Sequence, residues 1–320
     1  QWTNSLRPCA SSKAVCVEPF WPRRSPHFLA CRRAVRAAAE PGPAIIGVSG
    51  GPDSLALAAA AAAERVDARA VVVDHQLQPG SGKVAARAAE KARGFGLEAE
   101  VIPVTVDRAA SGGNLEAAAR EARYAALYAA AGERAEVWIA HTADDQAETL
   151  LLGALRGNPS GMAVRAGRVV RPFLTLRRSD TVGACDELGL DAWQDPMNAD
   201  PAFRRVAVRT QVIPALSDLL GGDAVPALAA TADRIAADRE LIEQLTNLTS
   251  TTDCGELLQD GAAVRNRRLA KWLLDNGVPV QGEQLAAIGA LVTDWHGQGP
   301  IPVAGGRAVV RIDGQLRLTP

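Results

Sequence analysis

A turn rich in glycine and hydroxyl groups is the first place where the chain could do chemistry. It consists of six consecutive residues, Ser49, Gly50, Gly51, Pro52, Asp53 and Ser54. Glycines lack a Cβ, so successive backbone N–H groups can point into one concavity, and the serine hydroxyls add donors that suit a phosphate. Asp53 would repel a bare phosphate, and we therefore interpret its carboxylate as a ligand for a Mg²⁺ ion that accompanies a nucleotide.

A group of carboxylates behind a histidine is the second candidate. His141 is followed by Asp144, Asp145 and Glu148. If a helix begins near Thr142, these carboxylates are spaced three and four residues apart and share one face. Acidic residues in a first helical turn also arise from the helix dipole alone, but Glu148 lies beyond that turn. Such a cluster could hold magnesium, orient an amine nucleophile or take its proton.

Both candidates need a scaffold that holds them in place. Residues 45–48 form a short β-branched run typical of a buried strand, and the alanine-rich segment after Ser54 is typical of a helix. Strands and helices alternate from residue 43 onward, which predicts an α/β fold: a Rossmann-like parallel sheet of about five strands with helices on both faces. The other elements expected here are strands at 70–74, 99–106, 137–140 and 190–193, and helices at 27–40, 82–95, 114–131 and 174–188.

Several candidate side chains lie where predicted strands end. Ser49 follows the first strand, Asp74 and His75 close the second, and His141 follows the fourth. Right-handed crossovers place the carboxyl ends of parallel strands at one edge, where ligands bind in such sheets. We therefore expect these side chains to share one crevice.

Length and composition limit the classes of protein to consider. The chain has 320 residues, a formal net charge of −1 and five cysteines. No C-x-x-C pair occurs, so neither a zinc site nor a disulfide framework is indicated, and we expect free thiols in a reducing cytosol. No apolar run reaches the length of a membrane span. The expected organisation is a disordered or mis-assigned extension at 1–26, a catalytic domain at 27–220, and a small mostly helical domain at 221–320 that ends in a β-hairpin.

Other interpretations of the turn are weaker. Residues 47–51 fit the G-x-S-x-G pattern of α/β-hydrolases, which would make Ser49 a nucleophile. His296 is the only histidine late enough in the chain to complete that triad, and it lies in the expected accessory domain. The turn is not a Walker P-loop, because no Lys-Ser or Lys-Thr closes it. A tight turn without a ligand would not require Asp53 and two serines.

An ordered set of motifs gives the chain a family resemblance. Across residues 43–317 it resembles the tRNA(Ile)-lysidine synthases, which are N-type ATP pyrophosphatases of the PP-loop family. The resemblance rests on the loop 49–54 and on motifs at 73–75, 77–81, 114–124, 141–149, 155–157 and 171–174, together with Asp195 and Asn198. One departure precedes Pro214, where Val206 and Ala207 replace residues typical of the family while Arg205 and Arg209 remain.

This resemblance implies a cytoplasmic, ATP- and Mg²⁺-dependent ligase that modifies tRNA. Its expected substrates are tRNA(Ile) with a CAU anticodon and free L-lysine. The wobble cytidine would be adenylated with release of pyrophosphate, and lysine would then displace AMP from C2 to give lysidine. No membrane partner is implied, and the oligomeric state stays open, with a homodimer as one alternative.

The resemblance also implies roles for the candidate residues. The loop 49–54 would hold the pyrophosphate portion of ATP with Mg²⁺ on Asp53, and Asp74 and His75 would lie at the adenosine end. Asp145 and Glu148 would position and deprotonate the lysine amine. The remaining expected site residues are Arg123 and His141 in catalysis, and Arg120, Asp144, Arg205 and Arg209 in substrate binding.

Related classes that share the loop find less support in the chain. tRNA thiolation enzymes use catalytic cysteines, often as C-x-x-C, and only Cys185 and Cys254 follow the loop. Glutamine-dependent amidotransferases need a glutaminase domain for which the chain has no room. A non-catalytic nucleotide-binding module would have little use for the acidic cluster. The basic residues of the accessory domain are either a solvated face or a phosphate track, and they are Arg265, Arg267, Arg268 and Lys271.

Overall fold

The computed structural model describes residues 21–22, 24–78, 80–105, 115–195, 203–245, 248–280 and 282–320. The chain divides into two compact units. The first contains the described residues up to Leu152 together with 160–233, and the second contains 153–159 and 234–320. Most of the expected extension at 1–26 lies outside the described residues, as do Asn114 and Asn198. The functional division at residue 220 stays a prediction.

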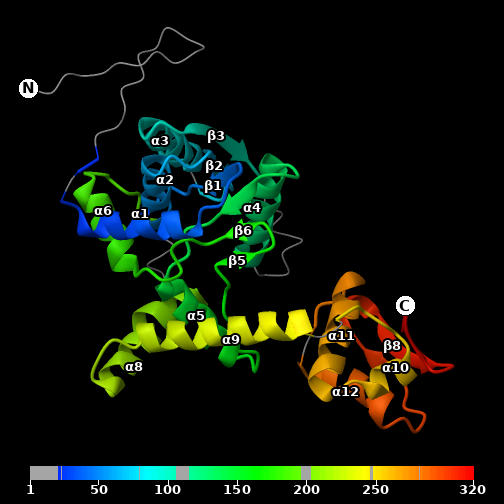
Figure 1. Ribbon diagram of the computed structural model, residues 1–320. Coiled ribbons are helices and arrows are strands. Elements are labelled where there is room, and N and C mark those ends of the chain that lie inside the picture. The colour runs from blue at the N-terminus through cyan, green and yellow to red at the C-terminus, as the bar shows by residue number, and fades with distance from the viewer. Residues whose placement is uncertain are drawn as a thin grey trace, which may run out of the picture. The chain divides into compact units, whose positions relative to one another are not determined.

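The first unit is built on a six-stranded sheet in the order β3-β2-β1-β4-β6-β5 (Figure 1). Neighbouring strands are parallel except for β5, which pairs antiparallel with β6 at the edge. The predicted Rossmann-like parallel sheet is therefore confirmed. The strands are β1 (Ala44–Gly47), β2 (Ala68–Asp74), β3 (Glu98–Pro103), β4 (Glu136–Trp138), β5 (Arg165–Ala166) and β6 (Val169–Val170).

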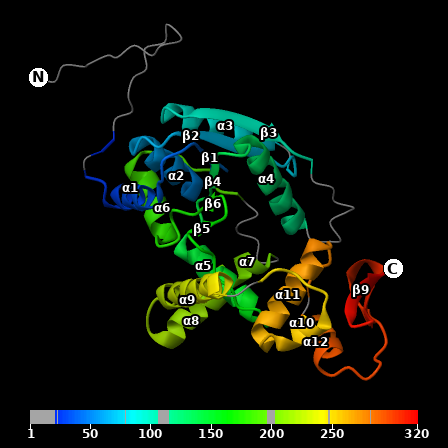
Figure 2. The same cartoon turned by 45° about the vertical axis from the view of Figure 1, so that its right-hand side comes forward.

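Helices cover both faces of this sheet. Figure 2 shows α1 and α2 on one side of the strands and α4 on the other. Alternation along the strands explains this arrangement, because Ile46 and Val72 belong to the cluster under α1, α2 and α3, whereas Ile45 and Val71 pack with Leu127 of α4. The helices are α1 (Pro26–Ala38), α2 (Pro52–Ala63), α3 (Ser81–Gly94), α4 (Leu115–Ala131), α5 (Ala143–Ala154) and α6 (Arg178–Glu187).

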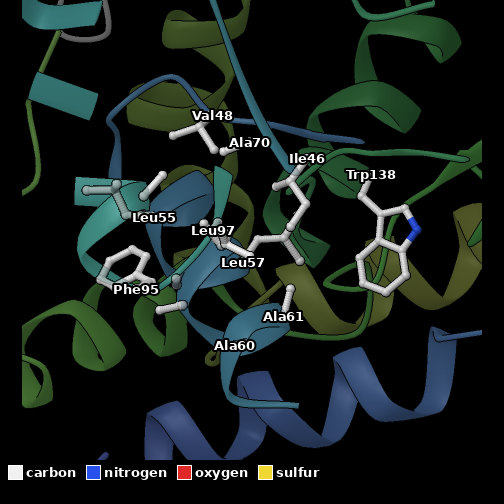
Figure 3. Packing of buried hydrophobic residues seen from close by; sticks show 14 of the residues in the cluster. Ile46, Val48, Leu55, Leu57, Ala60, Ala61, Ala70, Phe95, Leu97 and Trp138 are labelled. Carbon is white, nitrogen blue, oxygen red and sulfur yellow. The ribbon is translucent and has the colours of Figure 1, made fainter. Parts of the chain in front are cut away.

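Helix α2 is the most deeply buried of these helices, and it carries the glycine-rich turn at its start. Every side chain from Ser54 to Ala61 is buried, which is the expected fate of a helix that is apolar all round. Leu55 and Leu57 pack with Ile46 of β1 and with Phe95 and Leu97 (Figure 3). Burial of each leucine contributes about 1.5–3 kcal/mol, so the position of the turn is fixed by the core.

Two expectations about the end of the sheet are wrong. Residues 190–193 do not form a strand; the backbone N–H of Trp193 instead donates to the carbonyl oxygen of Gly50 at 2.9 Å. The sheet is extended by β6, which pairs with β4 through only two residues. The helix expected at 174–188 begins later, at Arg178. Residues 172–175 form turns instead, in which the side chains of Phe173 and Leu174 are buried.

A helical segment completes the first unit and continues into the second. It contains α7 (Arg204–Ala207), a π-helical turn at Val208–Val212, α8 (Ile213–Leu220) and α9 (Val225–Leu245). Val208, Ile213 and Val225 pack against Ala143 and Ala147 of α5. Helix α5 is thereby fixed against this segment. π-Helical turns are frequent at functional sites, and this one carries Arg209.

The second unit is a small helical domain with a terminal sheet. Its elements are α10 (Cys254–Gln259), α11 (Ala262–Asp275), α12 (Gly282–Thr293), β7 (Ile301–Pro302), β8 (Ala308–Ile312) and β9 (Gln315–Thr319). The predicted hairpin is confirmed, with Asp313 and Gly314 at positive φ in the turn between β8 and β9. Helix α10 and strand β7 were not predicted.

The basic residues of α11 are largely used inside this unit. Arg268 is 5% exposed and pairs with Glu256 and Asp260. Arg265 donates to the carbonyl oxygen of Asp260, and Lys271 pairs with Asp275. These contacts favour a structural role for Arg268, while RNA binding by the domain stays a prediction.

Within the part of the chain that the structure describes, no single helix has both the length and the hydropathy needed to cross a membrane. Two helical segments joined by a sharp bend, residues 204–220 and 225–245, reach the required length and hydropathy only when taken together.

Candidate active site

The glycine-rich turn is held in shape by its own serines. The Ser54 hydroxyl accepts a hydrogen bond from the Ser49 N–H at 3.0 Å and donates to the Gly51 carbonyl oxygen at 3.0 Å. Gly50 has φ +85°, and a Cβ there would lie 3.2 Å from the Cβ of Ala88. Both observations indicate a fixed backbone cradle at the N-terminus of α2, where the helix dipole and free N–H groups attract anions.

The hydrolase interpretation finds no support in this geometry. A nucleophilic serine needs a histidine within hydrogen-bond distance. The Ser49 hydroxyl lies 3.1 Å from the Ser54 hydroxyl and 3.4 Å from the N–H of Gly51. Among the described contacts of Ser49, none is to a histidine, and His296 belongs to the second unit.

Asp145 combines a capping role with a role in the acidic cluster. Its Oδ2 accepts from the backbone N–H of Thr142 at 2.8 Å and from the Thr142 hydroxyl at 2.9 Å. Its Oδ1 accepts from the Arg178 guanidinium at 2.9 Å. Burial, the largest influence, would raise the pKa of Asp145, but the Arg178 guanidinium and the hydrogen bonds from Thr142 oppose it, and the pKa is lowered. Asp145 is therefore a fixed carboxylate that stays ionised at neutral pH.

Arg178 is the functional candidate that the sequence analysis missed. Besides Asp145, its guanidinium lies 3.4 Å from Glu148 and 3.6 Å from Asp53. The Arg178 side chain thus connects Asp53 of the glycine-rich turn with two carboxylates of α5. One available signal was the position of Arg177 and Arg178 at the start of α6. Cations are unfavourable at a helix N-terminus, so a pair of arginines there indicates carboxylate partners nearby.

Glu148 is fully buried and is surrounded by arginines. Arg209 contacts both of its carboxylate oxygens, at 2.7 and 3.3 Å, and Arg205 lies 3.7 Å away. Arg178 is the third arginine around this carboxylate. A buried charge is tolerated only when it is paired in this way. Arg205 and Arg209, expected in substrate binding, are brought to Glu148 from α7 and the π-helical turn.

Asp144 faces a different pair of donors. Its carboxylate accepts from the Arg177 guanidinium at 3.2 Å and from the backbone N–H of Arg178 at 2.7 Å. These bonds join α5 to the start of α6. The structure therefore shows a linking role for Asp144, and its expected role in substrate binding stays a prediction.

Asp53 receives a hydrogen bond from the Thr181 hydroxyl and faces Arg178. Burial raises the pKa of Asp53 above its usual value, although Thr181 and Arg178 oppose this change. A divalent cation would favour the ionised form. In the described part of the chain no three His, Cys, Asp or Glu residues are grouped to hold a metal alone. A single carboxylate beside a phosphate cradle suits Mg²⁺, which binds through one or two carboxylates and substrate phosphates.

The two histidines at the strand ends have buried ring nitrogens. Nδ1 of His75 and Nδ1 of His141 are buried without a hydrogen-bond partner in the structure. Buried polar atoms are normally satisfied, so such atoms indicate a ligand or water. Burial lowers the pKa of both histidines, and the charges of Arg120 and Arg123 lower that of His141 further. Both imidazoles are therefore uncharged at neutral pH, and Arg120 and Arg123 lie close enough to His141 to act on it electrostatically.

The burial of His141 predicts a specific pH dependence of stability. The unfolded histidine takes up a proton below about pH 6.5, whereas the folded one stays neutral. The unfolded state then binds more protons, so stability is lost as the pH falls below 6.5, by at most about 1.4 kcal/mol per pH unit. Urea denaturation of His141→Gln between pH 7 and 5 is expected to show a shallower loss than the parent chain. Equal slopes would contradict a buried neutral His141.

Comparisons with known proteins agree on one family. A protein-family model described as a PP-loop domain matches residues 31–216. A tRNA(Ile)-lysidine synthase of Corynebacterium glutamicum is 47% identical over 314 residues, covering 93% of this chain and 96% of the relative. The synthase of Corynebacterium diphtheriae is 49% identical, and the match covers 95% of this chain and 100% of the relative. The synthase of Rhodococcus erythropolis is 43% identical, and the match covers 90% of this chain and 93% of the relative.

Solved structures with a similar fold include one of a tRNA-modifying enzyme. The U34-tRNA thiolase NcsA from Methanococcus maripaludis aligns with a TM-score of 0.53 at 14% identity, covering 70% of this chain and 82% of that one. At this identity the similarity concerns the fold alone.

Proposed function

The chain belongs to the tRNA(Ile)-lysidine synthase family, the ATP-using ligases with a PP-loop that form a carbon–nitrogen bond on tRNA, and from this premise we propose its reaction in detail. The substrates are ATP, free L-lysine and tRNA(Ile) with a CAU anticodon. In the first step the C2 oxygen of the wobble cytidine attacks the α-phosphorus of ATP and pyrophosphate leaves. In the second step the lysine amine attacks C2, AMP leaves with the C2 oxygen, and lysidine forms.

One observation carries this proposal. The carboxylates of Asp53, Asp145 and Glu148 meet at the guanidinium of Arg178, and Asp53 belongs to the same turn that forms the phosphate cradle. A two-step ligation needs phosphate binding and amine binding at adjacent positions, because the nucleophile of the second step must reach the product of the first. The cluster supports such adjacency.

The residues of the turn account for the nucleotide half of the reaction. The backbone of 49–54 would cradle the pyrophosphate portion of ATP, and Asp53 would hold Mg²⁺, which offsets the charge that develops on the phosphates. Asp74 and His75 would contact the adenosine end. The Nδ1 of His75 is buried without a partner and supports a ligand there.

The acidic residues of α5 would act in the second step, in which the lysine amine attacks. The ionised carboxylate of Asp145 and the buried carboxylate of Glu148 would hold the lysine amine and accept the proton that it loses on attack. His141, uncharged at neutral pH, would hydrogen-bond the cytidine side. Arg120 and Arg123 would bind the cytidine or its phosphate. The target base lies in an anticodon loop, so no base pair has to be opened.

The proposal is tested by substrate dependence. Pyrophosphate release from ATP is expected only with a transcript of tRNA(Ile) that carries CAU, and labelled lysine is expected to become stably attached to it. The matched control is the same transcript with the wobble cytidine changed to uridine, which keeps the rest of the RNA. ATP cleavage that ignores the RNA, or a requirement for a sulfur donor instead of lysine, would refute the proposal.

A further inference from the structure

A groove lined by tyrosine and arginine runs along one face of α4. It has a volume of about 460 Å³ and is lined by Ala117, Arg120, Glu121, Tyr124 and Tyr128. These residues repeat at spacings of three and four, so they form a single stripe over about three helical turns. Leu127 and Ala131, which pack against the sheet, lie directly beside this stripe, because they follow Arg120 and Tyr124 by seven residues. The groove therefore borders the core, and its outer edge is open because Glu121 and Tyr128 are exposed.

An arginine guanidinium lies over each of the two tyrosine rings in the groove. The ring centroids of Tyr124 and Tyr128 are 6.2 Å apart. Arg120 lies over the Tyr124 ring at 5.1 Å and also donates to its hydroxyl at 3.3 Å. Arg168, from the turn between β5 and β6, lies over the Tyr128 ring at 5.3 Å. Tyr128 is 37% exposed, so aromatic surface remains available beside two positive charges.

The stripe begins at the carboxyl edge of the sheet, where His141 lies. Helix α4 follows β3 and precedes the parallel strand β4, so its N-terminal end lies at the carboxyl edge of the sheet. The charges of Arg120 and Arg123 act on His141 at that edge. An RNA strand that placed one nucleotide beside His141 could therefore continue along the groove.

We propose that this groove is a stacking site for an unpaired base of the anticodon loop next to the target cytidine, with Tyr124 and Tyr128 as the aromatic platform and Arg120 and Arg168 as its cations. Single-stranded RNA is bound in this manner, by stacking on aromatic side chains and guanidinium planes. Glu121 places one carboxylate in the groove, where it can accept a hydrogen bond from the amino group of adenine or cytosine. The inference rests on the proposed function, because it assumes an RNA substrate.

A short RNA hairpin with the CAU anticodon loop tests the site directly. The anticodon adenine is replaced by 2-aminopurine, whose fluorescence is quenched on stacking. With the unaltered chain we expect binding and quenching. Tyr128→Leu is expected to weaken hairpin binding about tenfold and to relieve the quenching. Tyr128→Phe keeps the ring and is expected to behave like the parent. Arg134→Met, which removes an exposed arginine beyond the end of α4, controls for simple loss of charge and is expected to cause neither effect.

A cross-linking measurement on the unaltered chain makes the test independent of variant folding. A hairpin with a photoreactive 8-azidoadenine in place of the anticodon adenine is expected to cross-link to the peptide that contains Tyr124 and Tyr128. Cross-links that map only elsewhere, or a Tyr128→Leu chain that binds and quenches like the parent, overturn the stacking site. If the unaltered chain releases no pyrophosphate with the full tRNA, it is the proposed function that fails instead.

Discussion

Replacing Asp53 with asparagine is expected to reduce tRNA-dependent pyrophosphate release by roughly 10²–10³-fold, the scale of losing one preorganised electrostatic contribution to a transition state. Asparagine keeps the shape of the side chain and an oxygen that accepts from Thr181, so the turn is expected to stay intact. It removes the negative charge that would bind Mg²⁺ beside the phosphates. The loss should therefore appear in the chemical step and not in folding.

The measurement is the initial rate of pyrophosphate release at saturating ATP and tRNA over a titration of Mg²⁺. Asp67→Asn is the matched control, because Asp67 is an exposed aspartate directly before β2, at the amino edge of the sheet. It is expected to keep the parent rate. Thermal denaturation checks that both variants are folded. An Asp53→Asn chain that keeps the parent rate at every Mg²⁺ concentration would remove Asp53 from the reaction.

Much of the fold follows from short-range patterns in the sequence. The β-branched runs at 45–48 and 70–73 and the alternation with helices predict the central strands to within a few residues, because each of these strands is long enough or apolar enough to have a local signal. Strand β6 has no such signal. It is two residues long and exists because Val169 and Val170 pair with Val137 and Trp138, a long-range contact that no local pattern contains.

The same distinction explains which parts of the candidate site could be predicted. The loop 49–54 is contiguous, and the carboxylates of α5 lie within one helical turn of each other, so their spacing alone groups them. Arg178 is joined to Asp53 only through the packing of α6 against α2. Likewise, Arg209 reaches Glu148 from a π-helical turn. Guanidinium partners of this kind are set by tertiary structure, and the sequence indicates them only through the unfavourable position of two arginines at a helix start.

Replacing Arg178 with methionine is expected to raise the KM for lysine about 10–100-fold, a loss of about 1.4–2.7 kcal/mol in binding free energy, because the carboxylates that would hold the amine lose the guanidinium that fixes their positions. Methionine retains much of the apolar stem but leaves the three carboxylates without the guanidinium that they share. Arg178 is a main cause of the lowered pKa of Asp145. Its removal raises that pKa, so the acidic limb of the pH–rate profile is expected to move to higher pH.

A role for Arg178 in positioning the carboxylates differs measurably from a role in stability alone. A purely structural loss would lower the amount of active enzyme and leave the KM for lysine and the pH profile unchanged. Arg178→Lys keeps the charge without the planar fork, so partial recovery of the KM is expected. Arg177→Met is the matched control, because the neighbouring guanidinium contacts Asp144 and Asp223 and none of the three shared carboxylates. If Arg177→Met raised the KM as much as Arg178→Met, the effect would belong to the start of α6 as a whole. The shared guanidinium would then have no special part in holding the amine.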